Sequence, residues 1–236
     1  MEKLLEVLKM RKSDYSELEE ILGYKFKDRS LLDTAFTHKS FSNESAEKAH
    51  SYERFEFLGD AILEFVTSKE LFLEYPEKTE GELTKLRASL VCEYTLSQIT
   101  KNLGFGDYLY LSHGEEITGG KNRPSILCDL FESVLGAIYL DGGIDEAEKY
   151  IKKFLLSDIE GKSTFYDAKS ILQEYAQGNG LKLDYRLIST QGPEHNRVYR
   201  VVARLQGEEY EEGTGPTKKM AEQVAAHETI NRLGIE

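Results

Sequence analysis

The chain has 236 residues, of which 31% are charged and 40% are hydrophobic, so a disordered or fibrous protein is excluded. This length predicts roughly one or two domains whose core needs no disulfide bonds. The net charge of −12 argues against a protein that coats nucleic acid by overall charge alone.

Targeting and membrane signals are absent from the sequence. No apolar run approaches the roughly 18–20 residues of a membrane-spanning helix, and the first residues mix acids and bases unlike a secretory signal. Cys92 and Cys128 lie far apart, so we expect two reduced, buried thiols rather than a disulfide or a zinc site. These features predict a cytoplasmic protein without a membrane partner.

The first two thirds of the chain have the apolar spacing of helices, the last of which ends near Leu156. The polar segment that follows, 157–165, predicts a linker. The helical spacing recurs over residues 4–8, 18–22, 31–36, 55–72, 83–103 and 126–140.

The last 70 or so residues have a different pattern. A helix is expected over 168–177, and strands, from their β-branched and aromatic residues, over 185–189, 198–205 and 208–213. A final helix is expected over 217–233. The order is α-β-β-β-α, which predicts a small α+β domain after the all-α part.

Three carboxylates lie on one face of the helix expected around residues 53–65. Glu53, Glu56 and Asp60 fall within about 60° of one another at 100° per residue. A solvated acidic face is one interpretation, and a bound cation is the other. Phe57 falls beside the acids, which indicates a covered surface. The opposite, core-facing side is expected to hold Phe55, Leu58, Ile62 and Phe65.

A second acidic pair lies in the almost wholly apolar helix expected over 126–140. Asp129 and Glu132 share one face of it, and buried acids need either an ion pair or a metal. Together with the first set, they predict an all-oxygen site that prefers Mg²⁺ or Mn²⁺, typical of phosphoester hydrolysis. His38 is expected to form structural hydrogen bonds rather than bind the metal.

Basic side chains mark the start of the final helix. Lys218 and Lys219 follow two glycines and a capping Thr217, at a helix N-terminus that favours anions. A solvated helix end is the alternative, since the C-terminal part has slightly more acids than bases.

The segment Glu53-Arg-Phe-Glu-Phe-Leu-Gly-Asp-Ala resembles the signature of the ribonuclease III family. Residues 119–143 resemble the family's second acidic block, and residues 80–87 a further segment. The C-terminal module is similar to the double-stranded-RNA-binding domain. The resemblance implies an all-α endonuclease domain at 15–156, a linker at 157–165 and an RNA-binding domain at 166–235.

The resemblance also implies roles for single residues. Mg²⁺, with Mn²⁺ as a substitute, would be held by Glu56, Asp60, Asp129 and Glu132. Asp60, Glu132 and Glu53 would be catalytic, Glu80 an accessory acid, and Phe57 part of a homodimer interface. Duplex RNA would be contacted by Ser170, Gln173, Glu174, His195, Lys218 and Lys219. Pro216 and the weakly basic loop around His195 depart from the family pattern and imply a lower RNA affinity.

The implied activity is Mg²⁺-dependent cleavage of double-stranded RNA, leaving 5′-phosphate and 3′-hydroxyl ends with a short 3′ overhang. The implied substrates are ribosomal RNA precursors and other structured transcripts. Two alternatives stay open: an inactive relative that only binds duplex RNA, and an all-α nucleotide pyrophosphohydrolase. The RNA-binding module argues against the second alternative.

Overall fold

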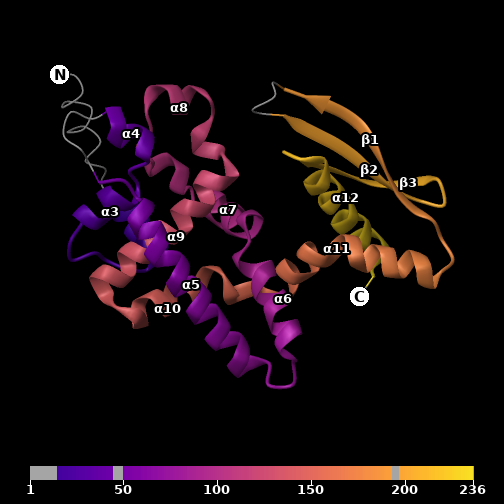
Figure 1. Cartoon of the computed structure of the whole chain (residues 1–236), viewed down its shortest axis with the longest axis horizontal. Coiled ribbons are helices and arrows are strands. Elements are labelled where there is room, and N and C mark those ends of the chain that lie inside the picture. The colour runs from indigo at the N-terminus through magenta and orange to yellow at the C-terminus, as the bar shows by residue number, and fades with distance from the viewer. Residues whose placement is uncertain (1–14, 45–49, 193–196, 236) are drawn as a thin grey trace. The chain divides into compact units, whose positions relative to one another are not determined.

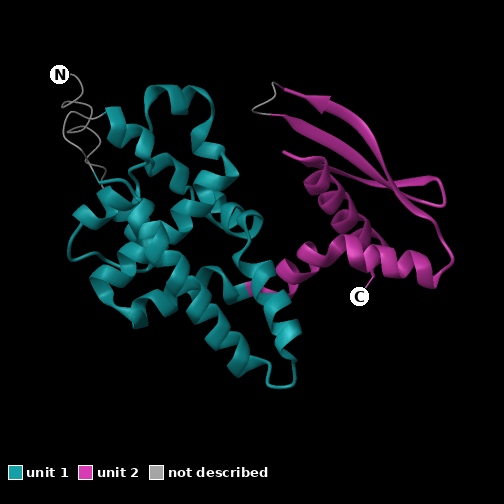
Figure 2. Cartoon of the chain, viewed as in Figure 1, with its two compact units in different colours: residues 1–157 teal, residues 158–236 magenta. Residues whose placement is uncertain are grey.

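The computed structural model describes residues 15–44, 50–192 and 197–235. The chain divides into two compact units, Met1–Ser157 and Asp158–Glu236 (Figure 2). Helices build the first unit, and helices with a three-stranded sheet build the second (Figure 1).

The first unit is all-α, as predicted, and forms around one central helix. The centre of this core is α9, where Leu130, Phe131 and Val134 are fully buried. Phe36, Leu63 and Leu96 from three other helical segments are also fully buried. The helices are α2 (Ser16–Leu22), α3 (Ser30–Ala35), α4 (Lys39–Glu44), α5 (Glu53–Glu74), α6 (Glu80–Val91), α7 (Glu93–Asn102), α8 (His113–Ile117), α9 (Pro124–Gly142) and α10 (Ile144–Phe154), with 3-10 turns η1 (Phe105–Tyr108) and η2 (Gly120–Asn122).

The two acid-bearing helices, α5 and α9, touch backbone to backbone at two glycines. A methyl group on Gly59 would come within 3.0 Å of the Glu132 carbonyl oxygen, and one on Gly136 would come within 3.0 Å of the Phe55 carbonyl oxygen. Residue 59 therefore lies against 132 while 55 lies against 136, so the helices run antiparallel at their contact. A glycine inside a helix lowers stability by about 0.5–1 kcal/mol relative to alanine. Here the missing side chain allows the two helix backbones to approach closely.

The core-facing side of α5 differs in part from the prediction. Of the four residues expected there, Ile62 is buried, Phe55 and Leu58 are half-buried, and Phe65 is exposed. The side chains that fill the core beside Ile62 are Leu63 and Val66. Apolar residues occupy both sides of this helix, so the helical wheel (a projection of the side chains at 100° per residue) did not by itself show which side faces inward.

The second unit has the predicted α-β-β-β-α order. Helix α11 (Ile159–Gly178) and helix α12 (Lys218–Leu233) pack on an antiparallel sheet of order β1-β2-β3. The strands are β1 (Leu183–Gln191), β2 (Val198–Leu205) and β3 (Glu208–Gly215). The core consists of small and branched side chains: Ala168, Leu172, Ala176, Ala203, Leu205, Ala225, Ala226 and Ile230.

The segment 157–165, predicted to be a linker, is helical. Residues Leu156–Asp158 form a 3-10 turn, and α11 begins at Ile159, nine residues before the expected start. The Asp158 side chain accepts a hydrogen bond from the Gly161 N–H at 3.1 Å, and the Lys162 ammonium donates to the Asp158 carbonyl at 3.0 Å. Such a cap stabilises a helix in polar sequence, where apolar periodicity is no guide.

Two expectations from composition concern sulfur and membranes. Cys92 and Cys128 are both free thiols, but each is half-buried rather than buried as expected. Within the ranges that the structure describes, no helix has the length and apolar character to cross a bilayer.

Candidate functional site

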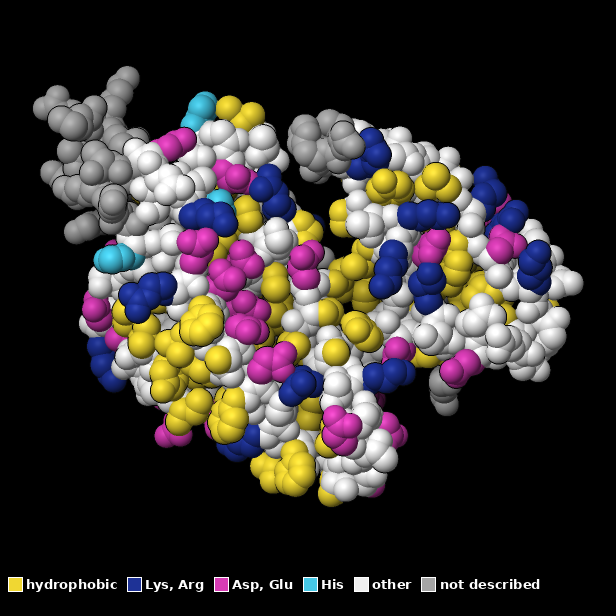
Figure 3. Space-filling model, in the orientation of Figure 1, with side chains coloured by type: hydrophobic (Ala, Val, Ile, Leu, Met, Phe, Trp, Pro, Cys, Tyr) yellow, Lys and Arg dark blue, Asp and Glu magenta, His cyan; other side chains and the backbone are white. Residues whose placement is uncertain are grey.

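Four carboxylates gather where α5 and α9 cross. Glu56 and Asp60 come from the first two turns of α5, and Asp129 and Glu132 come from the first half of α9. The contact of Gly59 with the Glu132 backbone brings these turns together. Figure 3 shows acidic side chains in one group on this face of the first unit, with hydrophobic side chains beside them.

The carboxylates disturb one another electrostatically. Burial raises the pKa of Glu132 to about 8, and the charges of Asp60, Asp129 and Glu56 add to the rise. Burial also raises the pKa of Glu56 to about 7, with contributions from Asp129 and Glu53. A partly buried group of like charges is destabilising unless a cation binds among them.

The donor set fits a hard divalent cation. All four side chains offer carboxylate oxygens, which Mg²⁺ and Mn²⁺ prefer over nitrogen or sulfur ligands. Among the described residues, no group of three or more histidine, cysteine, aspartate or glutamate side chains has the geometry of a formed metal site. Burial and neighbouring carboxylates raise the pKa of both Glu56 and Glu132, so a cation among these oxygens would be stabilised by them.

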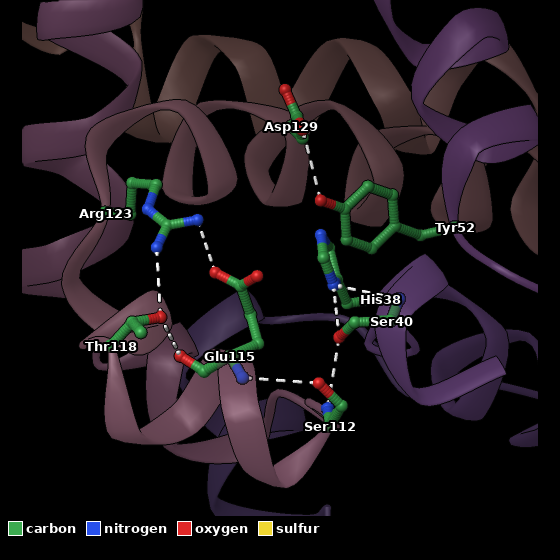
Figure 4. Close-up of polar contacts among 8 residues, drawn as sticks. All are labelled: His38, Ser40, Tyr52, Ser112, Glu115, Thr118, Arg123 and Asp129. Atoms are coloured by element: carbon green, nitrogen blue, oxygen red, sulfur yellow. Dashed lines mark hydrogen bonds and ion pairs between the residues drawn. The ribbon is translucent and has the colours of Figure 1, made fainter. Parts of the chain in front are cut away.

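Asp129 is held by a neighbouring tyrosine. The Tyr52 hydroxyl donates to Oδ2 of Asp129 at 3.1 Å, and the His38 ring packs against the Tyr52 ring with 5.6 Å between centroids (Figure 4). Burial raises the pKa of Asp129, and the hydrogen bond from Tyr52 opposes that rise. The sequence analysis did not single out Tyr52, although its place next to Glu53 was a usable signal.

His38 has the structural role expected for it. Its Nδ1 accepts a hydrogen bond from the Ser40 backbone N–H at 3.1 Å, and the Ser40 hydroxyl accepts one from the Ser112 N–H at 3.0 Å. Burial lowers the pKa of His38. Beyond Ser112, Glu115 forms an ion pair with Arg123, which ties α8 to the start of α9 (Figure 4).

Glu53 lies at the exposed edge of the carboxylate group. Its Oε1 is 3.3 Å from the Lys39 ammonium, and its Oε2 accepts a hydrogen bond from the Ser51 hydroxyl at 3.2 Å. Glu53 also contributes to the raised pKa of Glu56. The structure therefore places Glu53 beside the four carboxylates, in contact with solvent.

Glu80 is not brought to this group within one chain. It begins α6, which follows the far end of α5, and α5 extends about 20 Å from Asp60 to Glu74 at 1.5 Å per residue. Its Oε1 accepts a hydrogen bond from Thr84 on the same helix. The chain turn between α5 and α6 explains why a position near in sequence is distant in space.

One acid that the sequence analysis missed is Glu64. It follows Asp60 by one helical turn and contributes to the raised pKa of Glu132. Its Oε2 is 2.9 Å from Nε of Arg87, so it has a cationic partner from α6. The four-residue spacing after Asp60 was the signal that pointed to it.

The second unit exposes the side chains expected to contact nucleic acid. His195 lies outside the described residues. Thr217 caps α12 by accepting a hydrogen bond from the Met220 N–H at 3.1 Å. The exposed residues are Ser170, Gln173 and Glu174 on α11, and Lys218 and Lys219 in the first turn of α12.

An acid on α12 contacts two of the bases of this unit. Glu222 Oε2 is 2.5 Å from the Lys169 ammonium, and its Oε1 is 3.8 Å from the Lys218 ammonium. Pro216 is exposed between β3 and the capping Thr217. Part of the positive charge at the start of α12 is thus balanced within the chain.

Two family matches cover most of the chain. Residues 28–159 match the family described as Ribonuclease-III-like, and residues 168–233 match the double-stranded RNA binding motif. Ribonuclease 3 of Bacillus velezensis is 43% identical over 223 residues, covering 93% of this chain and 90% of the relative. Ribonuclease 3 of Anoxybacillus flavithermus is 44% identical over 224 residues, covering 93% and 94%.

Solved structures resemble the first unit. The nuclease domain of ribonuclease III from Campylobacter jejuni has a TM-score of 0.58 and 40% identity, covering 63% of this chain and 97% of that one. A second structure of that domain, described for flexibility in a region involved in dimer formation, has a TM-score of 0.56 and 42% identity, covering 61% and 99%.

Proposed function

Because this chain belongs to the ribonuclease III family, we propose that it cleaves double-stranded RNA with Mg²⁺ held by the carboxylates of α5 and α9. The products would carry 5′-phosphate and 3′-hydroxyl ends with a short 3′ overhang. The natural substrates would be ribosomal RNA precursors and other structured transcripts. Endoribonuclease activity on duplex RNA itself follows from the family and from the second matched domain.

The observation that carries the proposal is the meeting of two acidic pairs at one helix crossing. A nucleotide pyrophosphohydrolase is set aside because the family match covers residues 28–159. An inactive duplex-binding relative has no need of four carboxylates whose burial and mutual repulsion raise the pKa of Glu56 and Glu132. Retaining so costly an arrangement favours catalysis.

The residues have distinct roles in this proposal. Glu56, Asp60, Asp129 and Glu132 would bind Mg²⁺, or Mn²⁺ as a substitute. When bound, the ion supplies Lewis acidity and an activated water for phosphodiester hydrolysis. Glu53, at the edge with Lys39 as its partner, would shape the approach of the scissile phosphate. Asp60 and Glu132 would act most directly on the reacting groups. Glu80 is assigned as an accessory acid by resemblance alone, because α5 separates it from this group within one chain.

The second unit would hold the duplex. Ser170, Gln173 and Glu174 are exposed on one helix, suited to the 2′-hydroxyls of a minor groove. Lys218 and Lys219 lie at a helix N-terminus, where backbone N–H groups and the helix dipole also attract phosphate. We assign His195 to a further minor-groove contact by resemblance alone.

Replacing Lys219 by alanine is expected to weaken binding of RNA duplexes of any sequence. A lost phosphate contact should also lower the slope of log K against log salt by about 0.7–0.9. The measurement is duplex binding at several salt concentrations in EDTA. Arg232→Ala, in the last turn of the same helix and paired with Glu211, is the matched control and should leave the slope unchanged. An unchanged slope in Lys219→Ala would remove this residue from the interface.

We also propose that the nuclease unit forms a homodimer through α5. Phe57, Phe65 and Phe72 are 80%, 61% and 69% exposed along α5, and several large apolar side chains exposed on one helix indicate a partner surface. A groove of about 290 Å³ lies near Phe57, lined by Phe55, Leu58 and Leu140 among others. A cavity of about 150 Å³ holds a benzene ring, so this groove has room for the phenyl group of a second copy.

Truncation of Phe57 to alanine is expected to raise the dissociation constant of the dimer about 100-fold or more. Each copy would lose a buried phenyl group worth about 1.5–3 kcal/mol, and a two-fold interface counts the loss twice. Sedimentation velocity over a dilution series measures this. Ile117→Ala, which truncates another largely exposed apolar side chain, on α8, should leave the dimer intact. Equal dissociation constants for Phe57→Ala and the wild type would show that Phe57 lies outside the interface.

The domain assignment completes the proposal. Residues 15–156 would act as the endonuclease domain and 166–235 as the RNA-binding domain, joined through 157–165. Both cysteines are free, which suits a reducing compartment, so we place the activity in the cytoplasm.

The decisive experiment is cleavage of a long RNA duplex with Mg²⁺, with Mn²⁺ and with EDTA. We expect cutting with either metal and none in EDTA, and sequencing of both product ends should give 5′-phosphates and a short 3′ overhang. Duplex binding without cutting in Mg²⁺ would leave only a structured-RNA-binding protein. Cutting that persists in EDTA would refute the metal assignment.

A further inference from the structure

Tyr52 occupies the junction between the two acid-bearing helices. It is the residue that caps α5, and its carbonyl accepts hydrogen bonds from the N–H groups of Phe55 and Glu56. Its side chain reaches the other helix, where the hydroxyl lies 3.1 Å from Oδ2 of Asp129. One residue thus joins the start of α5 to a carboxylate of α9.

The position of this hydroxyl is fixed by its surroundings. Tyr52 is 2% exposed, and its backbone N–H donates to the Thr37 carbonyl at 2.9 Å. The His38 ring lies against its ring, and His38 is in turn held through its Nδ1 by the Ser40 N–H. Figure 4 shows the tyrosine hydroxyl directed at Asp129 from this packed position. A donor held in this way has little orientational freedom to lose when the site is loaded.

A carboxylate that binds a metal through one oxygen needs its other oxygen held. Without a partner for Oδ2, the Asp129 side chain has several rotamers and faces the repulsion of Glu56 and Glu132. Groups that orient metal ligands contribute about 10- to 100-fold to metal affinity or activity. Resting on the proposed function, we propose that Tyr52 is a positioning residue of the metal site: its hydroxyl holds Oδ2 of Asp129 and leaves Oδ1 as the ligand oxygen.

The test is direct binding of Mn²⁺ by calorimetry to the full chain, comparing the wild type with Tyr52→Phe. Tyr52→Phe removes one oxygen and retains the ring that packs on His38. We expect the dissociation constant for Mn²⁺ to rise about 10- to 100-fold, with duplex binding in EDTA unchanged. In cleavage assays the half-saturating Mg²⁺ concentration should rise by a similar factor, while the rate at saturating Mg²⁺ falls much less.

The matched control is Tyr150→Phe. Tyr150 is 3% exposed in the same unit, and its buried hydroxyl has no hydrogen-bond partner among the described residues. Removing that hydroxyl should leave Mn²⁺ affinity unchanged, so any general effect of losing a buried tyrosine oxygen is subtracted.

A double-mutant cycle separates positioning from folding. In an Asp129→Asn background, Tyr52→Phe should change Mn²⁺ affinity less than twofold, because the carboxylate that it positions is gone. An effect of equal size in both backgrounds would overturn the inference, as would wild-type affinity in Tyr52→Phe. If the wild type itself neither binds Mn²⁺ nor cleaves duplex RNA, the proposed function falls, and the inference falls with it.

Discussion

Glu132→Gln is expected to lower the rate of duplex cleavage at saturating Mg²⁺ by about 10³-fold or more. Glutamine has nearly the same shape but provides no negative charge for the ion, and a metal contributes several kcal/mol to stabilising the transition state. Each 1.4 kcal/mol corresponds to a factor of ten in rate. Duplex binding in EDTA should be retained, because the proposed RNA contacts lie in the second unit.

The same substitution should increase the stability of the metal-free protein. Burial and four neighbouring carboxylates raise the pKa of Glu132 from 4.5 to about 8. The free energy of unfolding therefore falls as the pH rises from 4.5, and the full loss is reached above about 8. Removing the charge should raise the melting temperature in EDTA at pH 9, where wild-type Glu132 is ionised. Glu146→Gln, which breaks an exposed 2.8 Å ion pair with Lys149, is the control and should change neither cleavage nor melting appreciably. Cleavage by Glu132→Gln at the wild-type rate would exclude this carboxylate from the metal site.

Gly59→Ala is expected to reduce the free energy of unfolding by about 3 kcal/mol and to slow cleavage about 100-fold. The added methyl group would overlap the Glu132 carbonyl, so α5 and α9 must move apart. Overpacking of a tight contact costs about 1–3 kcal/mol, and here backbone rather than a flexible side chain must yield. Separation of the helices also separates the carboxylates, and a displacement of about 1 Å costs about 100-fold in rate.

Chemical denaturation in EDTA measures the first effect, and cleavage at saturating Mg²⁺ measures the second. Gly81→Ala is the matched control for stability, since Gly81 lies in α6 with open space around it. That change should be neutral or stabilise the protein by up to about 1 kcal/mol, because alanine favours helices. Equal stability of Gly59→Ala and the wild type would mean that the two helices do not need their close contact.

Local sequence patterns predicted the elements well where one physical signal dominated. The strands of the second unit appear where β-branched and aromatic residues alternate, and Gln206 and Gly207 form the expected turn with positive φ angles of 54° and 85°. The helical conformation of 157–165 did not follow from the sequence pattern, because its helix is stabilised by the Asp158 cap rather than by apolar periodicity.

The sequence by itself determined which carboxylates share a face of their own helix. Glu56 with Asp60, and Asp129 with Glu132, follow from 3.6 residues per turn. The wheel gives angles within one helix, but it contains no information on where a second helix crosses it. For the same reason it assigned Phe65 to the core, although the structure exposes it.

Tertiary structure decided that the two acidic pairs meet. Gly59 and Gly136 permit backbone contact, and that contact sets the register of α5 against α9. The tertiary structure also keeps Glu80 away from the four carboxylates, because the chain reverses only after α5 has extended about 20 Å. Tyr52 reaches Asp129, 77 positions away, only in the packed structure. Periodicity specifies local geometry, whereas contacts between distant segments depend on side-chain volume and close packing throughout the unit.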